Sequence, residues 1–236
     1  MPEHTIKAFD TELQDIARMI AEMGALVEKQ IAAAGTALML HDVDAARHII
    51  PVDLEVDKLQ QEIEHKTVLT IARRQPMALD LRETIAALRI VGDLERMGDS
   101  AKSIAKRVIS GAGERSPAEA LHALARIIER VRGALRQVLD AYTRRDVERA
   151  LGVWRADQAI DAEVDALMRE LIAQMTADPR KIPICTDLLF CAKSIERFGD
   201  HATNIAETVY YMVKGKVLDA ERPKSSAVQY GTPARS

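Results

Sequence analysis

The residues best suited to chemistry in this sequence are four acidic pairs, each with its two members four positions apart. The pairs are Asp53 and Asp57, Glu95 and Asp99, Asp157 and Asp161, and Glu196 and Asp200. Residues four apart share one face of an α-helix, where two like charges destabilise the helix by roughly 0.2–0.5 kcal/mol. A chain that repeats this unfavourable spacing four times indicates that the carboxylates serve a function.

Basic neighbours offset this repulsion only in part. Asp99 has Lys102 at helical spacing and Glu196 has Lys193, whereas Glu95 has no basic residue three or four positions away. A merely solvated acidic face therefore remains the alternative to a binding site.

The elements that carry the pairs are predicted to be helices. The chain is 47% hydrophobic but only 3% aromatic, with 11 Gly and 8 Pro among 236 residues, which favours an all-α protein. Apolar residues recur every three or four positions, as in helices that pack against one another. The six expected helices pass through Leu13 to Val27, from about Asp44 into the early seventies, from Leu79 to about Ser110, from a capping box at Ser116, Pro117 and Glu119 to Tyr142, through Trp154 to Leu171, and through Leu189 to Val209.

The second half of the chain repeats the first. A shift of 104 residues brings the first acidic pair onto the third, and a shift of 101 brings the second onto the fourth. The slip of three falls in a loop, where insertions are tolerated. We therefore predict two tandem three-helix bundles related by pseudo-twofold symmetry, at 1–110 and 118–215, with a linker at 111–117 and a flexible tail at 216–236.

The acidic pairs are predicted to face each other within each bundle. Residues equally far from the turn that joins two antiparallel helices lie at the same height. The first two pairs are centred on residues 55 and 97. Pro76, in the predicted turn, lies halfway between these two centres. The other two are centred on 159 and 198.5, and their midpoint falls at Asp178 and Pro179, again a turn. Four carboxylates would meet at one level and would repel each other or bind protons.

A metal ion with oxygen ligands would relieve this repulsion. Iron, zinc, manganese and magnesium all fit carboxylate ligands, and His201 adds a nitrogen ligand to the second site. Gly98 and Gly199 are then explained as clearance beside the sites. The predicted metal ligands are Asp53, Asp57, Glu95, Asp99, Asp157, Asp161, Glu196, Asp200 and His201.

Composition narrows the class of protein further. The net charge of −3 and pI of about 6.1 give no electrostatic reason to bind nucleic acid or an anionic membrane. The least polar stretch, around 31–40, is shorter than the roughly 20 apolar residues that span a bilayer. The first ten residues do not resemble a signal peptide, so a cytoplasmic location is expected. Cys185 and Cys191 fit no metal or redox motif and are expected to be buried.

Two other interpretations compete with the metal site. A di-iron carboxylate enzyme is suggested by two Glu-x-x-His pairs, Glu62 with His65 and Glu119 with His122. The second pair would lie at the end of a bundle and the repeat supplies no counterpart, so we expect no enzyme. A metal-free helical scaffold is the other alternative. The apolar residues 38–40 do not belong to the periodic apolar positions that are expected to face the core. They would either close the end of a bundle or contact a second copy of the chain.

Two segments, RRQPMALDLRETIAALRIVGDLERMGD at 73–99 and DPRKIPICTDLLFCAKSIERFGDHATNIAETVYYMV at 178–213, closely resemble the PhoU family of phosphate-transport accessory and regulatory proteins. The resemblance extends over about residues 5–216. It implies two three-helix bundles with clusters of iron or zinc held on their surfaces by the acidic motifs. It also implies a cytoplasmic, usually dimeric, negative regulator of the phosphate-starvation response. Such a regulator links the Pst phosphate importer, through its ATPase PstB, to the sensor histidine kinase PhoR.

The two halves match the family's motif to different degrees. His201 and Asn204 correspond to the form GDHATNIAE, whereas the first half has Ser100 and Ser103 at the equivalent positions. Equal occupancy of the two sites therefore does not follow from the resemblance.

Overall fold

The computed structural model describes residues 2–111 and 116–219, and this part of the chain is almost entirely helical. The predicted all-α fold, with three long helices in each half, is confirmed. Of the predicted linker and tail, residues 112–115 and 220–236 lie outside the described residues. The helices are α1 (Pro2–Leu40), α2 (Val43–Arg74), α3 (Ala78–Ser110), α4 (Ala118–Arg144), α5 (Val147–Ala177) and α6 (Ile182–Lys214), with a short 3-10 helix, η1 (Pro179–Lys181), before α6.

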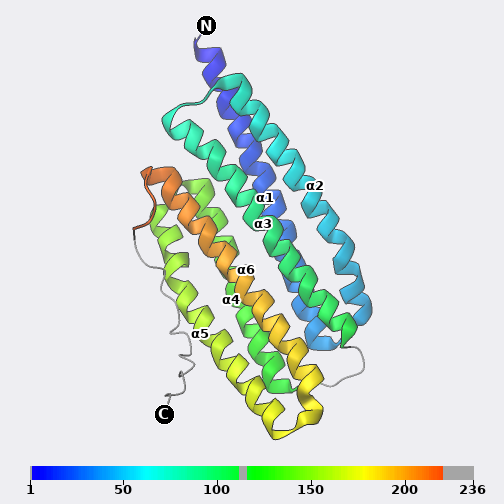
Figure 1. Ribbon diagram of the computed structural model, residues 1–236. Coiled ribbons are helices and arrows are strands. Elements are labelled where there is room, and N and C mark those ends of the chain that lie inside the picture. Colours follow the sequence, from blue (N-terminus) through cyan, green and yellow to red (C-terminus); the bar gives the residue numbers. More distant parts are fainter. Residues whose placement is uncertain (1, 112–115, 220–236) are drawn as a thin grey trace, which may run out of the picture.

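The two bundles pack side by side along their length. Figure 1 shows α3 and α6 adjacent in the middle of the molecule, with α2 and α5 at its two edges, and the view turned by 90° shows that the molecule is long and thin. The bundles touch through α3 against α6 and through α1 against α4. Apolar side chains from both halves form one continuous core. In the described residues, no helix has an apolar stretch long enough to cross a membrane.

The turns that start α2 and α5 show the repeat in detail. The Asp42 side chain accepts a hydrogen bond from the Ala45 amide at 2.9 Å, and the Asp146 side chain accepts one from the Arg149 amide at 3.0 Å. These N-caps stand 104 residues apart, as the sequence shift predicts. The aspartates fix where both helices begin because they satisfy amides that have no partner in the first turn.

The contact between α1 and α4 is built from two glycines that receive side chains from the opposite helix. A β-carbon on Gly24 would lie 2.2 Å from Cδ1 of Leu139, and one on Gly35 would lie 2.9 Å from Cδ1 of Ile128. A shift of 104 residues carries Gly24 onto Ile128 and Gly35 onto Leu139. The two contacts are therefore the same contact repeated, which is what a pseudo-twofold axis between the bundles requires.

The predicted capping box at the start of α4 is wrong. Pro117 is itself the N-cap, with ψ at 127°, and no side chain caps the helix. The extended backbone at Pro117 moves the first helical residue to Ala118, so Ser116 lies outside the reach of a cap. At the C-terminal end of α1, Leu38 is buried and Leu40 is 70% exposed, so Leu38 closes this end of the first bundle.

Both cysteines are free and buried, as predicted. Burial raises the pKa of the Cys191 thiol to about 12, which keeps it protonated at neutral pH.

Candidate metal centres

The two predicted acidic sites lie between the second and third helix of each bundle. We call Asp53, Asp57, Glu95 and Asp99, on α2 and α3, the first acidic site, and Asp157, Asp161, Glu196 and Asp200, on α5 and α6, the second acidic site. One aspartate in each is almost fully buried, Asp53 at 3% exposure and Asp157 at 2%. The other members are half-buried, except Asp99, which is exposed.

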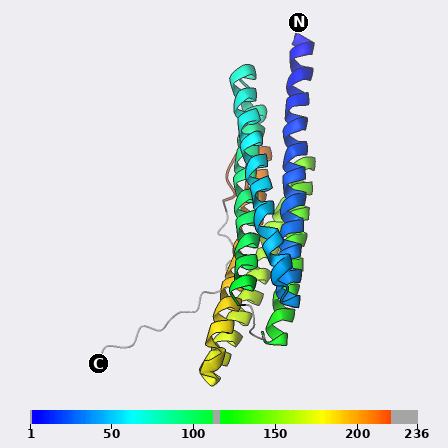
Figure 2. The same ribbon diagram turned by 90° about the vertical axis from the view of Figure 1, so that its right-hand side faces the viewer.

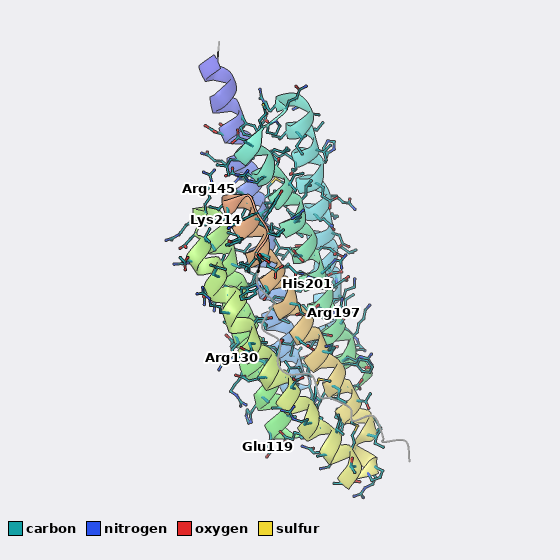
Figure 3. All side chains as sticks on the ribbon, turned by 60° about the vertical axis from the view of Figure 1, so that its left-hand side comes forward. Glu119, Arg130, Arg145, Arg197, His201 and Lys214 are labelled. Carbon is teal, nitrogen blue, oxygen red and sulfur yellow. The ribbon has the colours of Figure 1, made fainter. Side chains whose placement is uncertain are left out.

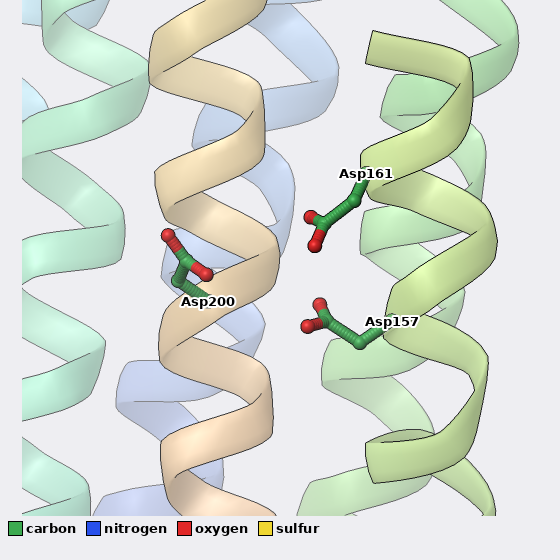
Figure 4. Close-up of side chains that lie close together, drawn as sticks. All are labelled: Asp157, Asp161 and Asp200. Carbon is green, nitrogen blue, oxygen red and sulfur yellow. The ribbon is translucent and has the colours of Figure 1, made fainter. Parts of the chain in front are cut away.

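Three aspartates of the second acidic site come together. Asp157 and Asp161 project from α5 towards Asp200 on α6 (Figure 4), and one carboxylate oxygen from each lies within 4.8 Å of those of the other two. Oxygens bound to one ion at about 2.0–2.6 Å lie no more than about 5 Å apart. The three carboxylates therefore fit one divalent cation as oxygen ligands.

Glu196, the fourth predicted ligand of this site, is engaged on its own helix. Its Oε2 accepts a hydrogen bond from Nζ of Lys193 at 2.5 Å. The structure thus brings three of the four carboxylates together and pairs the fourth with a lysine one turn away. Glu196 as a ligand stays a prediction that requires its side chain to leave Lys193.

His201 lies against the other bundle, about midway along α6 (Figure 3). Its Nδ1 is 2.9 Å from Oδ1 of Asp93 on α3, and Nδ2 of Asn204 donates to the same oxygen at 3.2 Å. Since an ionised carboxylate only accepts, His201 carries a proton on Nδ1 in this contact. Its role as a ligand stays a prediction, and what the structure adds is a polar contact between the bundles.

The first acidic site contains a positive charge of its own. Nζ of Lys102 forms an ion pair with Oδ2 of Asp53 and lies 3.4 Å from Oδ1 of Asp99. The other oxygen of Asp53 accepts a hydrogen bond from Nε2 of Gln30 on α1 at 3.4 Å. Among the described residues, no three acidic side chains of this site have ligand oxygens all within 4.8 Å of one another.

The carboxylates of the first acidic site nevertheless act on each other electrostatically. Burial raises the pKa of Glu95, and the negative charges of Asp99, Asp57 and Asp53 raise it further, while Arg96 opposes them. Acidic side chains from both α2 and α3 therefore gather around Glu95, at the level that the sequence predicted.

The two glycines beside the sites differ in how much space they provide. A β-carbon on Gly98 would lie 3.2 Å from Oε1 of Gln30 and 3.4 Å from Oδ1 of Asp53. On Gly199 it would make only ordinary contacts, the nearest at 3.4 Å to Val131 and the next at 3.7 Å to Asp157. The clearance is therefore needed at the first acidic site more than at the second.

The two Glu-x-x-His pairs do not form a di-iron site in the described residues. The four side chains are exposed, and α2 and α4, which carry them, do not contact each other. Figure 3 shows Glu119 at the end of the bundle, far from His201.

Sequence reasoning missed Gln30 and Asp93, and it counted Lys102 as a neighbour of Asp99 alone. Gln30 could have been found as a polar residue among the apolar positions of its helix, since it is buried on α1. Asp93 has no acidic counterpart in the repeat, where the equivalent residue is Ser194, so the spacing gave no signal for it.

Comparison with known proteins identifies the family. The PhoU domain model matches residues 20–108 and 124–209, which fall in the two bundles. A phosphate-specific transport system accessory protein PhoU homolog of Rhizobium meliloti is 47% identical over 221 residues, which cover 94% of this chain and 93% of the relative. The homolog of Caulobacter vibrioides strain NA1000 is 45% identical over 228 residues, or 95% of this chain and 97% of the relative.

Two solved structures have the same fold. The crystal structure of PhoU from Pseudomonas aeruginosa matches with a TM-score of 0.85 at 37% identity, covering 88% of this chain and all of that one. The phosphate transport system regulatory protein PhoU from Streptococcus pneumoniae matches with a TM-score of 0.84 at 30% identity, over 90% of this chain and all of that one. With two PhoU domains in its sequence and the fold of two PhoU structures, the chain belongs to the PhoU family.

Proposed function

We propose that this chain is a metal-binding adaptor that regulates phosphate uptake and represses the phosphate-starvation response when phosphate is plentiful. Family membership supports the link to phosphate transport, because relatives at 45–47% identity are named accessory proteins of a phosphate-specific transport system. In this proposal its partners are PstB, the ATPase of the importer, and the kinase PhoR. It acts in the cytoplasm as a homodimer, and it reaches the membrane only through these partners. Its role is regulatory rather than catalytic.

The convergence of Asp157, Asp161 and Asp200 carries the metal part of the proposal. A divalent cation bound there would offset two of the three negative charges and tie α5 to α6. Iron or zinc is the expected metal, and manganese and magnesium also suit the oxygen ligands.

Exposed apolar side chains at the two bundle tips are the surfaces we assign to partner contacts. Leu81 follows the turn between α2 and α3, and Ile182 follows the turn between α5 and α6, at the position 101 residues later. Met77, beside Leu81, is 80% exposed. Apolar groups held in water at equivalent places of both bundles fit an adaptor that binds other proteins there.

The regulatory proposal is tested by deleting the gene in its own host. We expect an alkaline-phosphatase reporter to stay on in high phosphate and to be repressed again by the wild-type gene. Repression that persists in the deletion strain would refute the regulatory role. Co-purification of PstB from phosphate-replete cells tests the proposed contact with the transporter.

The metal proposal is tested separately on the purified protein, with and without chelator. We expect Asp161→Asn to lower both the bound metal and the thermal stability. A metal-free scaffold predicts the opposite change in stability, because removing one of three neighbouring carboxylates relieves repulsion. Elemental analysis and thermal unfolding of the same samples distinguish the two.

A further inference from the structure

We infer that Lys102 is a built-in counter-ion of the first acidic site, which competes with metal there, so that the two sites bind metal with unequal affinity. The inference rests on the proposed metal binding. It concerns the order in which the two sites fill and the residue that sets this order.

The position of Lys102 is the first observation. Its ammonium group bridges Asp53 on α2 and Asp99 on α3, the two helices that supply all four carboxylates of the site. The Asp53 side chain is only 4% exposed, so one of its oxygens is held by an ammonium largely out of water. A cation that used Asp53 and Asp99 as ligands would have to occupy the same space.

The second oxygen of Asp53 is also engaged. Gln30 donates to it from α1, and the whole Gln30 residue is 2% exposed. Both oxygens of the most buried carboxylate therefore already have donors from the protein. A metal ion that binds both Asp53 and Asp99 therefore has to displace Lys102 from between them.

The repeat shows that neither donor is a general feature of the fold. A shift of 101 residues carries Lys102 onto Thr203, whose hydroxyl donates to the Gly199 carbonyl of its own helix at 3.3 Å. A shift of 104 carries Gln30 onto Ala134, which has no polar side chain. The two side chains that hold Asp53 therefore have no counterpart at the same two positions of the second bundle, where the lysine that pairs with a carboxylate of the site is Lys193, bound to Glu196.

The size of the effect follows from the contact that metal has to break. A hydrogen bond to a charged group contributes about 1.5–3 kcal/mol, which corresponds to a factor of about 10–100 in affinity. We therefore expect the first acidic site to bind a divalent cation about 10–100 times more weakly than it would without Lys102. Since the three aspartates of the second site already converge, that site should fill first, and the first should fill only at higher metal concentration.

The test is a titration of the full-length, chelator-treated protein with Mn²⁺, in which electron paramagnetic resonance measures the free ion. In the wild type we expect one tight class and one weak class of sites. Lys102→Thr, which introduces the residue of the second bundle, should tighten the weak class about tenfold or more. Lys102→Arg keeps the positive charge and is the matched control, so its weak class should stay weak.

Asp161→Asn assigns the classes, because it should remove the tight class and leave the weak one in place. If the titration of Lys102→Thr superimposes on that of the wild type, Lys102 is not a competitor and the inference is wrong. If no variant binds Mn²⁺, iron or zinc, the metal proposal fails and the inference fails with it. Helical circular dichroism of each variant checks that a lost class does not reflect unfolding.

Discussion

At the scale of single residues, Glu83 shows what a charge inside the core does. It is 8% exposed and stands 101 residues before Ile184, which is equally buried in the second bundle. Nε of Arg145 lies 2.6 Å from Oε1 of Glu83, so the buried carboxylate forms an ion pair with an exposed guanidinium. Burial raises the pKa of Glu83, and Arg145 only partly opposes the change.

The sign of the pH dependence follows from this direction. A carboxyl group whose pKa is higher in the folded protein than in the unfolded chain favours folding below its ordinary pKa, near 4.5. It loses that contribution as the pH rises through the raised value. Ionised Glu83 therefore reduces the stability of the protein at pH 7.

Replacing Glu83 with the residue of the repeat should relieve this cost. We expect Glu83→Ile to raise the free energy of unfolding by about 1 kcal/mol at pH 7, because an apolar residue often replaces a buried ion pair with a gain. The gain should shrink at pH 5, where Glu83 is closer to protonated. Urea unfolding at the two pH values measures both. A variant less stable than wild type at pH 7 would show that the contact with Arg145 outweighs the burial.

At the scale of residues, the sequence predicted where each carboxylate lies along its helix. It did not predict towards which neighbour a long side chain points. The four acidic pairs followed from spacing, because helical geometry alone puts residues four apart on one face. Lys193 pairs with Glu196 on its own helix, as the spacing indicated. The contacts of Lys102 with Asp53 and of His201 with Asp93 reach other helices and depend on rotamers set by neighbouring helices. Spacing therefore placed the carboxylates but not the lysine that fills one of the two sites.

At the scale of the elements, the crossing of α1 and α4 depends on the absence of a side chain at Gly24. Gly24→Ala would force Leu139 out of its present position. We expect the free energy of unfolding to fall by about 1 kcal/mol, since overpacking in a packed interface exceeds the gain in helix propensity. Thermal and urea unfolding measure the change.

Gly152→Ala is the matched control for this substitution. Gly152 is exposed within α5, and a β-carbon there meets nothing within 4 Å. The gain in helix propensity should then raise stability by up to about 1 kcal/mol. Stabilisation by both substitutions would mean that Leu139 moves aside at little cost.

The helix bounds were the most predictable part of the fold. Pro76 is a local signal that separates two helices whatever surrounds it, and α2 and α3 begin within one residue of the predicted starts at Asp44 and Leu79. Pro117 shows the limit of such reasoning. A proline fits either the first helical position or the residue before it, and only the backbone angle decides which.

At the scale of the whole molecule, the repeat predicted two bundles but not how they join. Four helices pack against neighbours in both bundles, namely α1, α3, α4 and α6. Their apolar faces are therefore buried partly within their own bundle and partly against the other bundle. A periodic pattern reports that a face is buried, and it does not report which helix buries it. The shared core is thus a property of the structure that the sequence pattern left open.

The contact of His201 and Asn204 with Asp93 joins the bundles inside this shared surface. His201→Ala should lower the free energy of unfolding by about 1–3 kcal/mol, because it removes a hydrogen bond to a largely buried carboxylate. Asp93→Asn keeps the shape of the side chain and removes its charge, so it should lower the free energy of unfolding by less than His201→Ala does. Equal stability of wild type and His201→Ala would mean that water replaces the imidazole without cost.

The continuous core also predicts that the two bundles unfold together. Trp154, the only tryptophan in the chain, lies on α5 and donates to Glu207 on α6 at 3.0 Å, so its fluorescence reports on the second bundle. Far-ultraviolet circular dichroism reports on all the helices.

The packing of α3 along α6 and of α1 along α4 means that losing one bundle would expose the apolar face of the other. We therefore expect the fluorescence and circular dichroism signals to give the same urea midpoint. A fluorescence midpoint that departs from the circular dichroism midpoint would show that each bundle is stable alone. In His201→Ala the two midpoints should fall by the same amount, because a contact shared by both bundles stabilises the whole molecule.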